Sequence, residues 1–113
     1  MTEVELAARL RRLPGVTVLG REARLARGFR ARLLGLAGLD REEAGDGLLL
    51  PRCSSVHTFG MRFPLDLYFL DGDGAVVGVR LALPPRRFAF CGQASAVLEL
   101  PAATGGEIAL PST

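Results

Sequence analysis

The sequence has 113 residues and a mass of 12.0 kDa, which is the size of one compact domain. Fourteen basic residues, all of them arginines, and 12 acidic residues leave a formal net charge of +2, and hydrophobic residues make up 49% of the chain. This balance is typical of a globular protein. The absence of lysine excludes chemistry that depends on a lysine side chain, and a single histidine excludes zinc motifs that need two.

The first part of the chain predicts one strand between two helices. Residues 2–13 place apolar side chains at helical spacing. Residues 16–23 alternate as a strand does, and Gly20 in that segment favours a bulge. A second short helix is expected over residues 24–36.

The remaining chain predicts short strands separated by turns. An acidic loop covers residues 40–47, and the Asp-Gly-Asp-Gly segment at residues 71–74 predicts a hairpin. The predicted strands cover residues 48–50, 65–70, 75–81, 88–91, 95–100 and 106–110. We therefore expect an α+β fold, a mainly antiparallel β roll or open barrel with one or two short N-terminal helices, in which residues 1–113 form a single domain.

The sequence also indicates where in the cell the protein is located. The first residues are acidic and lack the long apolar segment of a secretory signal. No apolar run reaches the roughly 18–20 residues that a membrane span needs. Two cysteines are too few for a disulfide framework. We expect a soluble cytoplasmic protein with no membrane partner.

Side chains with useful chemistry concentrate between residues 53 and 66. If residues 53–61 are extended, Cys53, His57 and Met61 lie on one face. Asp66 stands between two leucines, where a carboxylate needs a partner because burial of an unpaired charge is costly. Polar groups beside apolar ones are typical of a small-molecule pocket. The expected ligand-binding residues are Cys53, His57, Thr58, Met61, Arg62 and Asp66.

Alternatives to a ligand pocket start from the same segment. Cys53 and His57 have the side chains of a zinc site, with Asp66 or Cys91 as further ligands, or of a cysteine nucleophile with its base. The simplest alternative is a structural role in which His57 and the thiols only support the fold. The sequence identifies no catalytic residue and no cofactor.

An arginine-rich stretch at residues 9–32 raises the question of nucleic acid. The whole chain carries a net charge of only +2, and an acidic loop follows the stretch directly. In a protein without lysine, ordinary solvated positive charges must all be arginines. The net charge therefore argues against nucleic acid as a partner.

The central motif points to a family. Residues 57–77 read HTFGMRFPLDLYFLDGDGAVV, and LPPRR and AVLELPA follow at residues 83–87 and 96–102. This pattern resembles the family called domain of unknown function 192 over about residues 16–110. The resemblance implies a small β-rich fold and no established reaction. We therefore interpret the chain as an uncharacterised small protein that is a small-molecule-binding or interaction module centred on residues 53–66. The alternative is an enzyme with a Cys–His pair, or a metal site at Cys53, His57 and Asp66.

Overall fold

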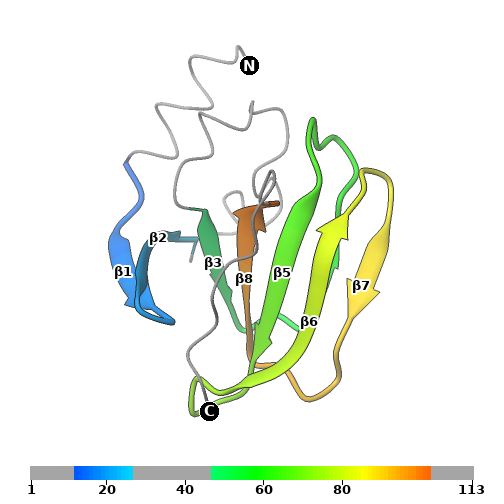
Figure 1. Cartoon of the computed structure of the whole chain (residues 1–113). Coiled ribbons are helices and arrows are strands. Elements are labelled where there is room, and N and C mark those ends of the chain that lie inside the picture. The colour runs from blue at the N-terminus through cyan, green and yellow to red at the C-terminus, as the bar shows by residue number, and fades with distance from the viewer. Residues whose placement is uncertain (1–11, 27–46, 103–113) are drawn as a thin grey trace.

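The computed structural model describes residues 12–26 and 47–102, and these residues form strands joined by turns (Figure 1). The predicted strand at residues 106–110 lies outside the described residues, as do nearly all of the two predicted helices and of the acidic loop. The strands are β1 (Gly15–Val18), β2 (Arg21–Leu25), β3 (Leu48–Pro51), β4 (Ser55–His57), β5 (Leu65–Leu70), β6 (Val76–Leu83), β7 (Phe88–Phe90) and β8 (Ala96–Pro101).

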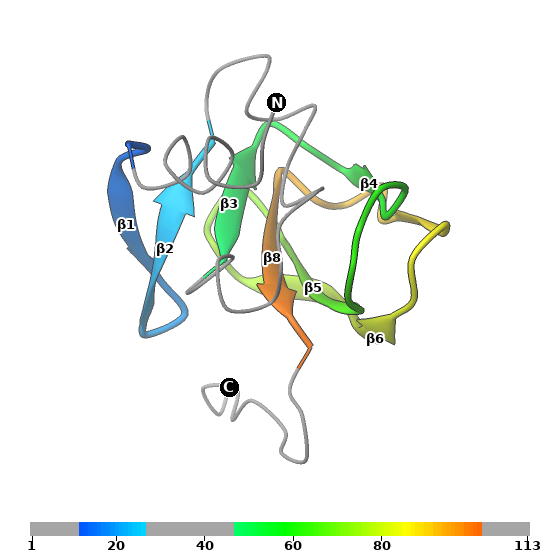
Figure 2. The same cartoon turned by 90° about the horizontal axis from the view of Figure 1, so that it is seen from above.

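The strands form two separate sheets. Six of them form one sheet in the order β1-β2-β3-β8-β5-β6, while β4 and β7, among the strands described, pair only with each other. The β2–β3 pair is parallel and the other pairs are antiparallel. Figure 2 shows the β1–β2 hairpin at one end of the large sheet, far from β4 and β6.

The predicted fold class is therefore wrong. Within the described residues the protein is all-β, without a helix, and its sheets are open and mixed instead of forming an α+β roll or barrel. The expected second helix fails at its start, because Arg24 and Leu25 continue β2 and pair with Leu48 and Leu49 of β3. Residues 12–26 and 47–102 include no helix that could span a membrane.

Most predicted strands are confirmed to within two residues, with one instructive exception. Residues 16–23 form two strands instead of one, because Leu19 and Gly20 adopt positive φ angles of 52° and 74° and turn the chain back on itself. Gly20 therefore belongs to a hairpin turn and not to a bulge. Glycine suits this position because a positive φ costs it little.

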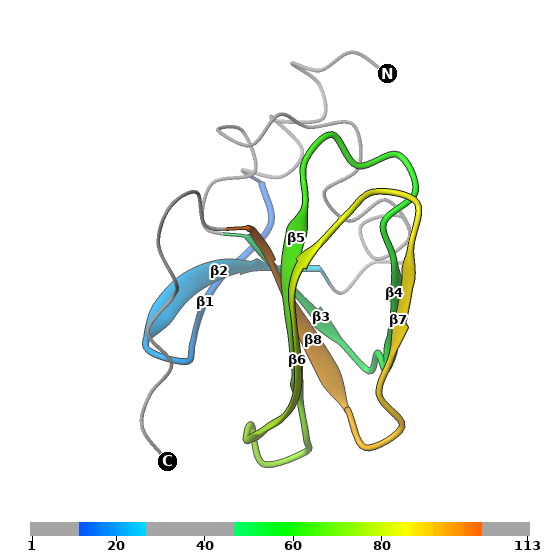
Figure 3. The ribbon, with the colours of Figure 1, turned by 45° about the vertical axis from the view of Figure 1, so that its right-hand side comes forward.

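Strand β5 lies at the centre of the core, and all six of its residues are buried. Leu65, Leu67 and Phe69 point to the side of the sheet that also packs against Val56 of β4 and Ala89 of β7. The intervening Tyr68 and Leu70 belong to a second apolar cluster on the opposite face. Figure 3 shows β4 and β7 as a separate layer beside the large sheet. This two-sided burial explains why β5 reads as a nearly continuous apolar run.

The β5–β6 hairpin turn depends on one carboxylate. Asp71 Oδ1 accepts hydrogen bonds from the backbone amides of Asp73 at 2.9 Å and Ala75 at 3.0 Å. Replacing Asp71 with alanine removes both bonds and should lower the free energy of unfolding by about 1 kcal/mol. Asp71→Asn keeps an acceptor oxygen, so its free energy of unfolding should fall clearly less than that of the alanine variant. Urea denaturation of both variants checks this, and equal losses would contradict the role given to the side-chain oxygen.

Candidate functional site

Strands β4 and β7 form a two-stranded ribbon with one buried and one exposed side. Its register places Val56 opposite Ala89, His57 opposite Phe88 and Ser55 opposite Phe90. Val56 and Ala89 pack into the core. Because side chains alternate along a strand, the other two pairs point outward. Phe88 is 72% exposed and Phe90 is 74% exposed.

The exposed side of the ribbon carries a group of planar rings, which we call the aromatic face (His57, Phe59, Phe88 and Phe90). The ring centroids of Phe59 and Phe88 lie 5.2 Å apart in an edge-to-face arrangement. The imidazole of His57 lies 5.9 Å from the ring of Phe59 and 6.4 Å from that of Phe88. These separations fall within the range of favourable aromatic pairs. The rings of His57, Phe59 and Phe88 therefore support one another, and all four rings of the aromatic face remain open to solvent.

Thr58 joins the aromatic face to the loop that precedes β7. Its side chain is fully buried, and its hydroxyl donates a hydrogen bond to the carbonyl of Pro84 at 2.7 Å. The same hydroxyl accepts one from the backbone amide of Arg87 at 2.8 Å. The Thr58 backbone adds two bonds, from its amide to the Arg87 carbonyl and from the Arg86 amide to its carbonyl. Thr58 therefore holds the loop before β7 through its buried side chain and its backbone.

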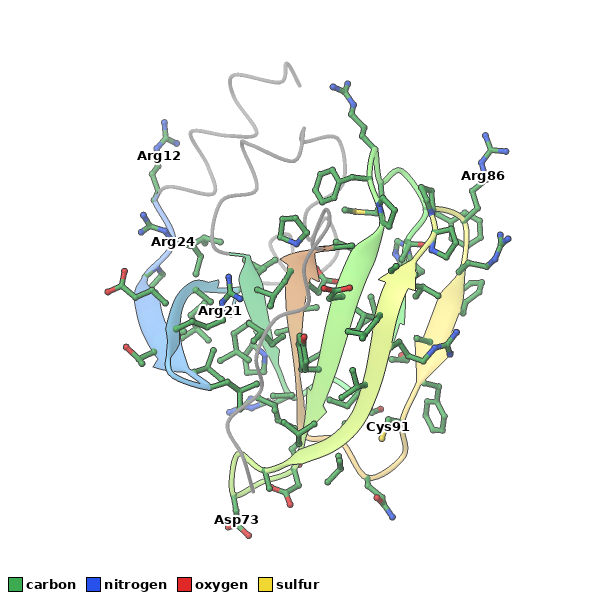
Figure 4. All side chains as sticks on the ribbon, viewed as in Figure 1. Arg12, Arg21, Arg24, Asp73, Arg86 and Cys91 are labelled. Carbon is green, nitrogen blue, oxygen red and sulfur yellow. The ribbon has the colours of Figure 1, made fainter. Side chains whose placement is uncertain are left out.

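The loop held by Thr58 presents two cations beside the aromatic face. Arg86 and Arg87 are both exposed, and the Arg87 guanidinium donates to the carbonyl of Arg86 at 3.3 Å. Figure 4 shows the Arg86 side chain extending away from the end of the ribbon. Arg86 has a positive φ of 66°, which changes the direction of the backbone directly before β7 begins.

The structure brings only some of the predicted site residues together. His57 belongs to the aromatic face, while Met61 is buried in the core behind it. Asp66 lies opposite Leu100, on the face of the large sheet that is turned away from the ribbon. There it accepts a hydrogen bond from the backbone amide of Ala82 at 2.8 Å and supports an irregularity between β5 and β6. His57 and the buried Asp66 therefore lie on different sides of the large sheet.

The remaining predicted residues are also dispersed. The thiol of Cys53 is half-buried and donates to the backbone carbonyl of Ser55 at 3.0 Å. Both Cys53 and Cys91 are free thiols. Arg62 is exposed, beyond the end of β4. The described residues contain no group of three or more His, Cys, Asp or Glu side chains that could hold a metal ion.

Sequence reasoning missed two features. Phe88 and Phe90 are separated by a single small residue, and this aromatic-small-aromatic alternation predicts two rings on one strand face. Glu99 stands between two leucines in β8, the same signal that singled out Asp66. Glu99 is 3% exposed and lies between Leu48 and Leu67 of the neighbouring strands. Its Oε1 has no hydrogen-bond partner in the described part of the chain, and burial raises the pKa of Glu99 to about 8.

Comparison with known proteins agrees with this open all-β architecture. A crystal structure of a protein of unknown function from Novosphingobium aromaticivorans DSM 12444 matches with a TM-score of 0.60 and 25% sequence identity, over 78% of this chain and 71% of that chain. No curated protein has a significantly similar sequence. Residues 15–110 match the model of the family DUF192, described as an uncharacterized ACR, and the chain belongs to this family. The resemblance drawn from the central motif is confirmed.

Proposed function

We propose that this protein is a binding module and that the aromatic face is its recognition surface. The observation that carries the proposal is the exposure of Phe88 and Phe90, at 72% and 74%, on either side of the buried Ala89. Large rings held in water on a short, well-paired strand remain available to a partner. Aromatic side chains of this kind provide much of the free energy of binding at recognition sites.

The surroundings of the aromatic face favour a ligand that is both planar and anionic. Edge-to-face rings leave ring surface on which a planar group can stack. Arg86 and Arg87 stand at the end of the same strand, and a guanidinium pairs well with carboxylate or phosphate. The proposed centre therefore includes His57 from the segment 53–66 and extends to residues 86–90.

The alternative role as an enzyme receives less support. A cysteine nucleophile paired with His57 and oriented by Asp66 requires close contacts among the three side chains. Asp66 faces away from the ribbon, and the Cys53 thiol is directed to a backbone carbonyl. The position of Asp66 and the hydrogen bond of the Cys53 thiol favour binding over nucleophilic chemistry.

An NMR titration tests the proposal with 2-naphthoate, a planar anion, and with cyclohexanecarboxylate as a non-planar anion. Amide shifts caused by 2-naphthoate should centre on residues 55–59 and 86–90. Phe88→Ala should weaken this binding by roughly five-fold or more, since one aromatic contact contributes on the order of 1 kcal/mol. Leu81→Ala is the matched control, because Leu81 is also exposed, at 54%, but belongs to β6.

The result can contradict the proposal in two ways. Shifts that map to another surface would place the recognition site elsewhere. Equal affinities of the wild type and Phe88→Ala for 2-naphthoate would show that the ring does not contact the ligand.

A further inference from the structure

We infer that the aromatic face binds single-stranded nucleic acid, with bases stacked on its rings and phosphates held by Arg86 and Arg87. This inference rests on the proposed function and names the class of partner. Proteins that bind single strands combine aromatic side chains for successive bases with cations that follow the backbone. The ribbon presents both components within a few residues of each other.

The first argument is the spacing of the rings. Phe88 and Phe90 are two residues apart on β7, which separates them by roughly 6.5 Å along the strand. His57 lies directly opposite Phe88 on β4 and adds a planar ring across the ribbon. Phe59 supports this pair from the end of β4, because it contacts both rings. The rings thus form a row along β7 with a second ring beside it, which suits consecutive unpaired bases.

The second argument is the sequence around β7. Sheets that bind RNA through exposed strands use a basic residue followed by aromatic-small-aromatic, in which the small residue faces the core and the two rings stack on bases. Arg86-Arg87-Phe88-Ala89-Phe90 has this order, and Ala89 is buried while Phe88 and Phe90 are exposed. The topology of the sheets in this protein differs from that of such RNA-binding sheets. The shared feature is therefore the local pattern of basic and aromatic residues and not the fold.

The third argument is the distribution of charge. Every charged residue in segments 52–65 and 75–98 is an arginine. The acidic residues of the described segment 47–102 are elsewhere: Asp66 and Glu99 are buried, and Asp71 and Asp73 belong to the β5–β6 turn. The expectation against nucleic acid used the net charge of the whole chain, whereas a phosphate backbone responds to local charge. The surroundings of the aromatic face are complementary to an anion.

A single strand fits these rings better than a duplex does. The bases of a duplex are stacked on one another, and their faces are closed to side chains that stand on a flat ribbon. Unpaired bases expose both faces and can stack on phenylalanine in any sequence. The inference therefore predicts a preference for single strands with little sequence dependence.

Fluorescence anisotropy tests this with the full chain and labelled oligonucleotides of about 12 nucleotides, a length within the range of single-strand binding sites. The probes are single-stranded RNA, single-stranded DNA and a DNA duplex of the same sequence. Binding should be tighter to either single strand than to the duplex. The double variant Phe88→Ala with Phe90→Ala should bind single strands roughly 25-fold more weakly or worse. The reason is that the loss of each stacking contact lowers the affinity by about five-fold or more.

Two matched controls separate the aromatic face from general surface effects. Val79→Ala with Leu81→Ala removes two exposed apolar side chains at the same spacing on β6 and should leave the affinity unchanged. Arg86→Gln with Arg87→Gln should make the dependence of log affinity on log salt shallower by about 1.4, since each phosphate contact contributes about 0.7. Arg80→Gln, which removes an exposed arginine from β6, should change this slope less.

Several results would overturn the inference. These are equal affinity for single strands and duplex, insensitivity to loss of the two phenylalanines, or no binding at low salt. Stronger competition by decaglutamate than by unlabelled oligonucleotide would identify an acidic peptide as the better partner. Self-association that requires Phe88 and Phe90, without oligonucleotide binding, would assign the face to a second copy of the chain. If 2-naphthoate still maps to the aromatic face in any of these cases, the proposed function stands without this partner; if it does not, both fail.

Discussion

Replacing Glu99 with glutamine should remove most of the loss of stability that the wild-type protein undergoes as the pH rises from about 4.5 to about 8. Burial in an apolar environment raises the pKa of Glu99 from its ordinary value of 4.5 to about 8. In this range the unfolded chain releases the proton and the folded chain keeps it. The contribution of the protonated carboxyl is thus fully present below pH 4.5 and is lost as the pH passes through 8, by up to about 5 kcal/mol in total.

Chemical denaturation at a series of pH values measures this effect. Glu99→Gln keeps the shape of the side chain but cannot ionise, so its free energy of unfolding should exceed that of the wild type at high pH. Asp73→Asn is the control, because it also removes one carboxylate but from an exposed position in the β5–β6 turn. Parallel pH profiles for the wild type and Glu99→Gln would show that the carboxyl does not titrate in this range.

Replacing Thr58 with valine should lower the free energy of unfolding by about 2 kcal/mol. Valine preserves the volume but lacks the hydroxyl that donates to Pro84 and accepts from Arg87. Both backbone groups then lose a partner in a buried contact. Since these bonds hold the loop before β7, the variant should also weaken any binding that depends on Arg86 and Arg87.

Thr58→Ser separates the hydroxyl from the methyl group of the same side chain. Serine retains both hydrogen bonds. The free energy of unfolding should therefore fall by only about 1 kcal/mol, because one buried methyl group is lost. Thermal denaturation of the two variants compares the effects. A serine variant as unstable as the valine variant would assign the stabilisation to packing instead of to the hydrogen bonds.

Local sequence signals predicted the individual strands well. The Asp-Gly-Asp-Gly turn and its two flanking strands follow from turn chemistry and from period-two burial, both of which act over a few residues. The arrangement of the strands does not follow in this way. The parallel pairing of Arg24 and Leu25 with β3 depends on a partner more than 20 residues away, and these two residues carry no local feature that distinguishes them from the start of a helix. This long-range pairing is one reason that the predicted fold class was wrong.

Only part of the candidate site was predicted from the sequence, and the reason is related. The extended segment beginning at Cys53 was expected to present one continuous face, but regular pairing covers only Ser55–His57. Beyond His57 the chain turns, which buries Thr58 and Met61 and exposes Phe59. Asp66 satisfies a backbone amide on the far face of the sheet, as a buried carboxylate between leucines must find some partner. The contribution of β7 could not be placed, because the pairing of β4 with β7 joins segments separated by 30 residues.

The position of β8 in the sheet also determines how the chain can assemble. Strand β8 is the last described strand in sequence, yet it lies between β3 and β5 at the centre of the large sheet. During synthesis, the edges of β3 and β5 that pair with β8 remain unpaired, and their leucines remain exposed, until residues 96–101 have left the ribosome. Among the described strands, only the β1–β2 and β5–β6 hairpins can close earlier from local contacts. Such dependence on distant pairing slows folding and leaves the nascent chain open to aggregation until β8 has paired.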